Sequence, residues 1–249
     1  MNNEHISVVN ESQSNGTRFI NAYNTIDHSL RNQYNFKTNI SFTDLIRRCS
    51  TLNTIVRVYE AELVDFARLR NAIIHSKSEI LIAEPNLDVV ELFEKIAALV
   101  STPPIAIEAI KSGEVDTAPA TFTLRELILE VTKVRHSNLP IYKGNTLIGV
   151  IRWRKFVEVL GGHVISTGKS IDEFLSTTTA EEFLRNYPSN SHYMVVARDF
   201  TVEQALTHFH NNRKLACIII TKDGTDSCRP IGIITSSDVM DLMQVVENY

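Results

Sequence analysis

Cys217-Ile-Ile-Ile220 and Ile231-Gly-Ile-Ile234 are short apolar runs separated by the polar stretch Thr221–Pro230, which predicts two adjacent strands joined by a hairpin loop. Thr201-Val-Glu-Gln-Ala-Leu206 precedes them with helical spacing, and a second helical stretch, 239–243, follows. The order helix, strand, turn, strand, helix is therefore the unit that decides the fold of this half of the chain.

The same order occurs once more, closer to the N-terminus. Its segments are 123–127 (helix), 139–142 (strand), 147–151 (strand) and 156–160 (helix). An internal duplication is the simplest account of this agreement. It predicts two like units packed about a pseudo-twofold axis.

The first hundred residues follow a different, purely helical pattern. A polar tail to residue 16 precedes an amphipathic segment with apolar side chains at Phe19, Tyr23, Ile26, Leu30 and Tyr34. Ser41 is expected to cap a second helix, one longer helix is expected over 55–73, and Asn86 is expected to cap a helix over 87–100. We therefore predict an α+β multidomain protein in which an all-α bundle over 17–101 precedes the duplicated half.

The duplicated half resembles a pair of CBS motifs, also called a Bateman module. The resemblance is carried by Ser137-Asn-Leu-Pro-Ile-Tyr142 with Gly149-Val-Ile151, and by Gly232-Ile-Ile-Thr-Ser-Ser-Asp238. It spans roughly 105–247 and implies a first motif at 105–162, then a linker and a second motif at 163–249. Such modules bind adenosine-containing ligands between their motifs and regulate an attached domain. The resemblance thus implies an adenine nucleotide (AMP, ADP, ATP or a related compound) as regulatory ligand.

The chemistry of the second motif suits such a ligand. A helix N-terminus with free N–H groups and hydroxyls can bind a phosphate, and a carboxylate can accept hydrogen bonds from both ribose hydroxyls. By resemblance, Asp238 would hold the ribose and Thr235 and Ser237 the phosphate or ribose, with Ser137 and Ile233 completing the cleft. Thr235-x-x-Asp238 before an apolar run is equally a helix capping box that needs no ligand.

The first motif departs from this pattern, because Arg152 replaces the hydroxyl and Lys155 the carboxylate. A lysine cannot accept hydrogen bonds from a ribose. We therefore expect one dominant nucleotide site per chain, with the cleft that contains Lys155 and 215–218 degenerate. Arg152, Arg154 and Lys155 either clamp a polyphosphate there or form a solvated helix start.

In the helical half, Arg70-Asn71-x-x-x-His75 resembles the R-N-x-x-x-H motif of HEPN domains. That resemblance implies a metal-independent ribonuclease that acts as a homodimer. His75 would transfer the proton and Arg70 would hold the phosphate, with Asn71 on the same helix face as His75. An inactive HEPN scaffold and an unrelated bundle remain alternatives.

Composition limits the other classes of function. The net charge is −4 and the sequence pI about 6.1, so broad polyanion binding is not expected, and RNA would have to bind at a local site. The three cysteines have no metal-ligand spacing, and neither a membrane span nor a secretory signal is evident, which predicts a cytoplasmic protein without a catalytic metal. We expect a nucleotide-regulated ribonuclease; the alternative is a non-catalytic nucleotide-sensing adaptor whose bundle dimerises or docks a partner.

Overall fold

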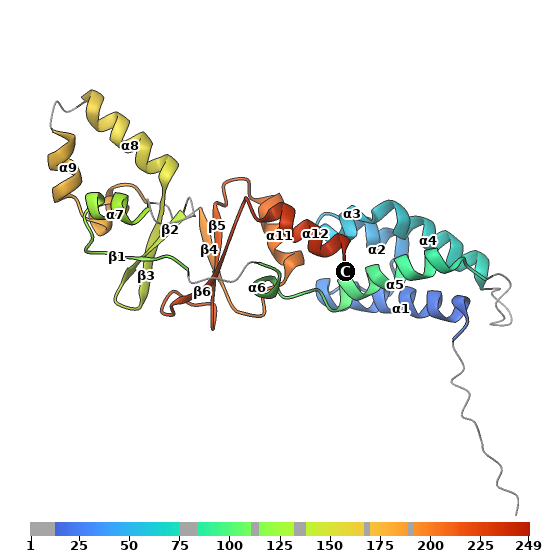
Figure 1. Ribbon diagram of the computed structural model, residues 1–249. Helices are drawn as coiled ribbons and strands as arrows, with labels where there is room; N and C mark the ends of the chain where they lie inside the picture. Colours follow the sequence, from blue (N-terminus) through green and yellow to red (C-terminus); the bar gives the residue numbers. More distant parts are fainter. Residues whose placement is uncertain (1–12, 75–83, 111–114, 132–137, 167–169, 189–191) are drawn as a thin grey trace, which may run out of the picture. The chain divides into compact units, whose positions relative to one another are not determined.

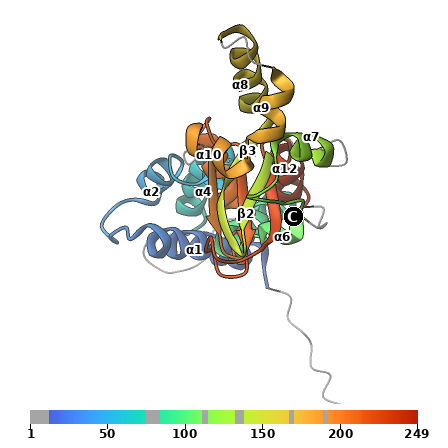
Figure 2. The same ribbon diagram turned by 90° about the vertical axis from the view of Figure 1, so that its left-hand side faces the viewer.

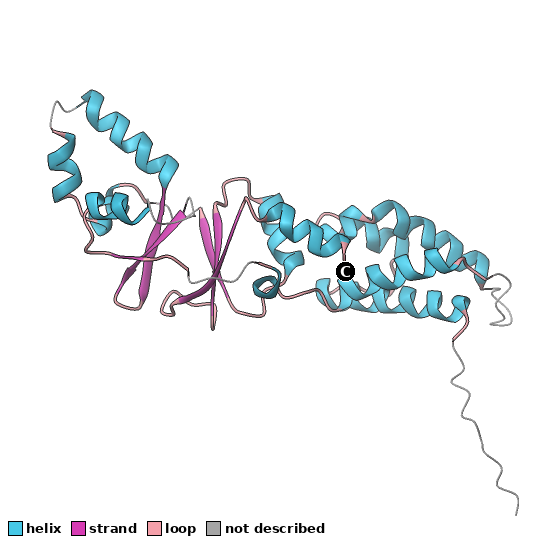
Figure 3. Cartoon of the chain, viewed as in Figure 1, coloured by secondary structure: helices cyan, strands magenta, loops and turns pink. Residues whose placement is uncertain are grey.

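A computed structural model describes residues 13–74, 84–110, 115–131, 138–166, 170–188 and 192–249 (Figure 1). The chain divides into two compact units, residues 1–103 with Tyr249 and residues 104–248. The first unit is helical over its described residues, whereas the second combines helices with two small sheets (Figure 3). Mixed helix and sheet content in this order agrees with the predicted fold class. His75 and Ser137 lie outside the described residues.

The helical unit is built from α1 (Asn15–Tyr34), α2 (Phe42–Cys49), α3 (Thr54–Val58), α4 (Glu60–Ile73) and α5 (Leu87–Ser101). The predicted caps are confirmed, because the side chains of Ser41 and Asn86 accept hydrogen bonds from the first turns of α2 and α5. Two boundaries differ from the prediction. α1 begins at Asn15, inside the predicted tail, and Tyr59 separates α3 from α4 where one continuous helix was expected.

Three aromatic rings form the centre of this unit. The ring of Phe93 on α5 lies 4.7 Å from that of Phe19 on α1 and 4.7 Å from that of Phe66 on α4, measured between centroids. Arg18 and Glu94 add a short ion pair between α1 and α5, with 2.6 Å between nitrogen and oxygen. Burial of large apolar side chains at the predicted helical spacing accounts for the bundle.

The second unit contains the duplication predicted from the sequence. Each copy has the order strand, helix, strand, strand, helix. The first copy comprises β1 (Ala118–Pro119), α7 (Leu124–Val131), β2 (Asn138–Lys143), β3 (Thr146–Arg152) and α8 (Trp153–Ser166), and the second comprises β4 (Tyr193–Val196), α11 (Val202–Asn211), β5 (Cys217–Thr221), β6 (Pro230–Thr235) and α12 (Val239–Glu247). In both sheets the first two strands are parallel and the last two antiparallel. The sequence did not predict the short strands β1 and β4.

Each copy is completed by a helix from outside its own segment of the chain. The helix before the first copy packs on the second copy, and the helix before the second copy packs on the first. The short α6 (Ala106–Ala109) packs against α11 and α12 of the second copy, whereas α10 (Ala180–Asn186) lies beside β3 of the first (Figure 2). An isolated antiparallel β-bridge accompanies each of these helix contacts. Ile105, before α6, pairs with Thr201, before α11, and Thr179, before α10, pairs with Thr123, before α7. The predicted division at residue 162 does not match this arrangement, because α8 continues to Ser166 and α10 lies in the predicted linker yet packs on the first copy.

The two sheets share a core. Tyr142, Leu147 and Val150 of the first copy pack with Cys217, Ile219 and Ile233 of the second. The loop between β5 and β6 of the second copy also contacts Tyr142 of the first. The Tyr142 hydroxyl donates a hydrogen bond to the carbonyl of Cys228, and the Arg229 guanidinium lies 4.8 Å from the Tyr142 ring centroid. The copies therefore form one packed body, with the ends of their strands available to build a site.

Candidate functional site

Strand register makes the two copies directly comparable at the residues that the sequence singled out. Asn138 pairs with Arg152 at the end of the first hairpin, and Cys217 pairs with Thr235 at the end of the second. Arg152 thus occupies the position of Thr235, and three residues further along Lys155 occupies the position of Asp238. The structure therefore places the predicted site residues and their substitutes at equivalent turns. We call residues 152–155 the first turn and residues 235–238 the second turn.

At the second turn, the predicted ligand-binding groups bond to one another. Oδ2 of Asp238 accepts the Thr235 backbone N–H at 2.6 Å and the Thr235 hydroxyl at 2.8 Å. The Ser237 hydroxyl lies 2.7 Å from that of Thr235, while Ile233 is buried in the core shared by the sheets. α12 begins at Val239, where the predicted helical stretch begins, and Asp238 is its N-cap. Ser137, expected to complete this cleft, lies outside the described residues.

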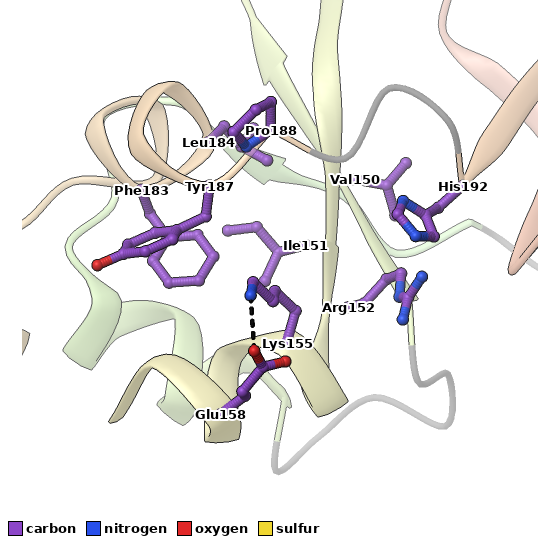
Figure 4. Close-up of a pocket in the computed structure, with 10 residues that line it drawn as sticks. All are labelled: Val150, Ile151, Arg152, Lys155, Glu158, Phe183, Leu184, Tyr187, Pro188 and His192. Atoms are coloured by element: carbon purple, nitrogen blue, oxygen red, sulfur yellow. Dashed lines mark hydrogen bonds and ion pairs between the residues drawn. The ribbon is translucent and has the colours of Figure 1, made fainter. Parts of the chain in front are cut away.

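A pocket of about 300 Å³ lies at the first turn, between β3, the start of α8 and the end of α10 (Figure 4). Six of its ten described lining residues are apolar or aromatic: Val150, Ile151, Phe183, Leu184, Tyr187 and Pro188. The Phe183 and Tyr187 rings lie 5.1 Å apart between centroids and belong to α10 and the residue that follows it. A cavity of this size and lining suits a flat apolar ring.

Lys155 and Glu158 form the polar edge of this pocket. The Lys155 Nζ atom donates to Oε1 of Glu158 at 2.9 Å, as the dashed line in Figure 4 marks, and lies 5.9 Å from the Tyr187 ring centroid. This hydrogen bond, with the nearby charges of Lys155, Arg154 and Arg152, holds the pKa of Glu158 below its usual range. Both side chains are solvent-exposed in part, so the pair adds little stability. It leaves the carboxylate ionised and already partnered.

A second, larger cleft of about 530 Å³ adjoins this pocket, and Arg152 and His192 line both. Among the described residues, four cationic side chains line it, two from each copy. Arg152 and Arg154 come from the end of β3 and the start of α8, whereas Arg213 and Lys214 come from the loop before β5. Ser236 of the second turn also lines it, but Thr235, Ser237 and Asp238 do not.

The basic cleft, as we call this second cavity, has an uncompensated charge. No aspartate or glutamate is among the described residues that line it. Within the described ranges, none of its four cations has a carboxylate at ion-pair distance. Burial raises the pKa of the thiol of Cys217, which follows the lining residue Ala216, to about 12, so that side chain is neutral at physiological pH. The charged side chains that line the cleft are therefore, among the described residues, all positive.

In the helical unit, Arg70 and Asn71 lie in the last turn of α4. The Arg70 guanidinium lies 5.4 Å from the Tyr23 ring centroid, and its Nε is buried without a hydrogen-bond partner among the described residues. Asn71 is exposed. His75 lies outside the described residues, so the structure describes only Arg70 and Asn71 of the three predicted catalytic side chains, and their catalytic role stays a prediction.

The sequence indicated the first-copy cations of the basic cleft and the segment 215–218 opposite them, of which Leu215 and Ala216 line the cleft, but it did not indicate Arg213 and Lys214. Arg152, Arg154 and Lys155 were marked as a possible polyphosphate clamp, but Arg213 and Lys214 had no motif to distinguish them from ordinary surface cations. The available signal was the duplication itself. Alignment of the copies places Arg213 and Lys214 just before the strand that corresponds to β2, next to the turn that carries Arg152.

The two β-α-β-β-α copies form a tandem module with cavities near the ends of their strands. Residues 184–245 match the model of the CBS domain family, so the chain contains a CBS domain there. The part of the resemblance that concerned a CBS domain is thereby confirmed for the second copy. No curated protein sequence matches the chain, and no finding supports a HEPN domain.

Solved CBS structures are similar to the duplicated half. The CBS domain of the bacterial CNNM/CorC family Mg²⁺ transporter in complex with ATP is 19% identical, covers 62% of this chain and 95% of its own, and has a TM-score of 0.43. The CBS domain of a membrane protein from Sphaerobacter thermophilus is 17% identical, with coverages of 62% and 97% and a TM-score of 0.43. A CBS pair in complex with 5′-methylthioadenosine and S-adenosyl-L-methionine is 18% identical, with coverages of 57% and 98% and a TM-score of 0.38.

The described residues contain neither a metal-ion cluster nor a helix suited to cross a membrane. Among these residues, no group of three or more His, Cys, Asp or Glu side chains is placed to hold a metal ion. None of the described helices combines the length and the apolar character that crossing a membrane requires.

Proposed function

We propose that residues 104–248 bind an adenine nucleotide and act as a regulatory module. The observation that carries this proposal is that two unlike cavities adjoin. They are the 300 Å³ pocket beside Phe183 and Tyr187, which we call the aromatic pocket, and the basic cleft, and Arg152 and His192 line both. A nucleotide has the same two parts, a flat base and a charged phosphate chain. The CBS domain at 184–245 supports the adenine class, because CBS domains bind adenine nucleotides.

In this arrangement the base lies between the apolar wall of β3 and the rings of Phe183 and Tyr187. Stacking on an aromatic face is favourable for any base. The phosphates pass Arg152, whose guanidinium can bind a phosphate through two parallel N–H groups. Lys155, paired with Glu158, closes the edge of the pocket and supplies no acceptor for a ribose.

Calorimetric titration of the full chain with ATP tests the proposal. The variant Tyr187→Ala removes one aromatic wall, and we expect it to weaken ATP binding about tenfold, in line with the loss of one stacking contact. Tyr249→Ala, which removes an exposed ring at the chain end, is the matched control and should bind as the wild type does. Absence of ATP binding to the wild type, or equal affinity in Tyr187→Ala, would contradict the proposal.

Regulation by this module would act on the helical unit. We propose that ligand binding alters the unit over 1–103 through the Pro103-Pro104 joint that follows α5. Hydrogen exchange of α1 and α5 with and without saturating ATP measures this directly, and unchanged protection would exclude coupling.

Ribonuclease activity and homodimer formation remain predictions from the R-N-x-x-x-H resemblance. RNA cleavage in EDTA by wild type and His75→Ala tests the first, with analysis of the product ends for cyclic phosphates. Light scattering tests the second. Cleavage that is lost in His75→Ala would establish the ribonuclease, equal cleavage by both proteins would indicate a contaminant, and absence of cleavage by either favours the non-catalytic adaptor.

A further inference from the structure

The basic cleft has more positive charge than a nucleoside monophosphate can balance. Its four cations are Arg152, Arg154, Arg213 and Lys214, and the copies contribute two each. A monophosphate has about two negative charges near neutral pH, as a phosphate ester does. Like charges brought together at one cleft repel one another, so a ligand with more negative charge relieves more of that repulsion.

The described residues of the cleft do not include the carboxylates that would hold a metal ion with the phosphates. Mg²⁺ binds nucleotides through one or two protein carboxylates together with phosphate oxygens. Among the described residues that line either cavity, the only carboxylate is Glu158, whose oxygen accepts a hydrogen bond from Lys155. The charge that neutralises a phosphate chain here therefore comes from arginine and lysine.

The dimensions of the site agree with an elongated ligand. The cleft has a volume of about 530 Å³ beside the 300 Å³ pocket, and Arg152 lines both, whereas Arg154, Arg213 and Lys214 line the cleft and not the pocket. Arg213 and Lys214 precede β5, whereas Arg152 ends β3, so phosphates that reach both pairs connect the two copies. Binding would then depend on how they are packed together.

We propose that this site selects its ligand by phosphate number and binds a metal-free nucleoside polyphosphate of at least three phosphates in preference to a monophosphate or a nucleoside. The inference rests on the proposed function, which requires only that an adenine nucleotide bind. It adds the charge class of the ligand. It also makes the two copies joint contributors to one site, with the second copy supplying half of the charge.

Titration calorimetry of the full chain with adenosine, AMP, ADP and ATP in EDTA at constant ionic strength tests this. We expect affinity to rise about threefold to tenfold with each phosphate, because a charge-assisted contact contributes roughly 1 kcal/mol or more. Saturating Mg²⁺ should weaken ATP binding, since it neutralises part of the ligand charge. Inorganic tripolyphosphate should compete with ATP.

Two double variants test whether Arg213 and Lys214 cause the preference for ATP over AMP. In Arg213→Ala/Lys214→Ala we expect ATP affinity to fall to that of AMP while AMP affinity stays within about threefold. The matched control is Arg198→Ala/Lys222→Ala, which removes two exposed cations from the same copy at the opposite ends of β4 and β5. Thermal unfolding is measured on both variants to check that they are folded.

The outcomes separate the inference from the proposed function. Equal affinity for AMP and ATP, or an Arg213→Ala/Lys214→Ala variant that still prefers ATP as strongly as the wild type, overturns the inference and leaves nucleotide binding intact. Binding of tripolyphosphate without binding of any nucleotide supports the anion cleft and overturns the proposed function.

Discussion

Leu184 of α10 lies against Gly149 of β3 so closely that a Cβ atom at residue 149 would be 2.9 Å from its Cδ1 atom. The second copy repeats this relationship with wider spacing, because a Cβ at Gly232 would lie 3.3 Å from Ile110 and 3.4 Å from Ile107. Each copy therefore has its completing helix packed on the glycine of its last strand. Leu184 also lines the aromatic pocket, so this contact shapes the candidate site.

Gly149→Ala should therefore destabilise the protein and disturb the pocket. The added methyl group displaces Leu184, and overpacking of this kind costs about 1–3 kcal/mol of unfolding free energy. Gly232→Ala is the matched control, with an expected loss of less than about 1 kcal/mol because its contacts are looser. Urea unfolding measures both, and a Gly232→Ala loss equal to or larger than that of Gly149→Ala would contradict the packing described.

Much of this fold follows from local patterns in the sequence. Alternation of apolar runs and polar turns located β2, β3, β5 and β6, and the caps at Ser41 and Asn86 located two helix starts. The packing of α6 on the second copy and of α10 on the first could not be predicted in this way. It depends on which helix reaches which glycine, a contact between segments distant in the sequence.

The candidate site was harder to predict for the same reason. The sequence directs attention to Thr235 and Asp238, whose types fit a known motif, yet these side chains satisfy each other across one turn. The cavities lie at the other turn, where Arg152 meets residues of α10 and of the loop before β5. Only the packing of the copies brings those residues together.

Acidification should loosen the first copy before the second. The Oε2 atoms of Glu126 and Glu182 accept hydrogen bonds from the N–H and hydroxyl groups of Thr123 and Thr179, and these bonds lower the pKa of both carboxyls. Their stabilising contribution is present above the unfolded-state pKa, about 4.3 for glutamate, and is lost as pH falls through the lower folded-state pKa. At the position equivalent to Glu126, the second copy has Gln204, which does not titrate.

Hydrogen exchange between pH 5 and pH 3 measures this difference between the copies. We expect protection of α7 and α10 to decline with acid before that of α11. In Glu126→Gln/Glu182→Gln, which makes these caps resemble the one at Gln204, the acid sensitivity of the first copy should diminish. Glu173→Gln on α9 (Ile171–Thr177) removes an exposed carboxylate that accepts neither bond and should leave it unchanged. Simultaneous loosening of both copies would show that these carboxylates do not control the transition.

The three thiols should differ sharply in reactivity. Burial raises the pKa of Cys49 to about 11 and that of Cys217 to about 12, so their thiolate fractions at pH 8 are negligible. Cys228 is only half-buried. A disulfide reagent at pH 8 should therefore modify one thiol per native chain, and Cys228→Ser should abolish this reaction. Modification of a second thiol at a comparable rate, without denaturant, would show that one of the two cores opens readily.

Asp238→Ala distinguishes the two turns as ligand sites. We expect a loss of about 1–2 kcal/mol of unfolding free energy, because the half-buried carboxylate accepts two hydrogen bonds from Thr235 and hydrogen bonds to a charged group contribute more than neutral ones. ATP affinity should stay within about twofold of the wild type, since Asp238 lines neither the aromatic pocket nor the basic cleft.

Ser237→Ala is the control for this comparison, because it removes a neighbouring exposed hydroxyl and leaves the bonds from Thr235 to Asp238 in place. Urea unfolding and ATP titration are measured on all three proteins. A tenfold or greater loss of ATP affinity in Asp238→Ala, with stability unchanged, would assign the ribose to the second turn, as the family pattern in the sequence predicts. Lost stability with retained affinity instead makes Asp238 a structural residue of that turn, and the ligand then belongs to the turn that contains Arg152.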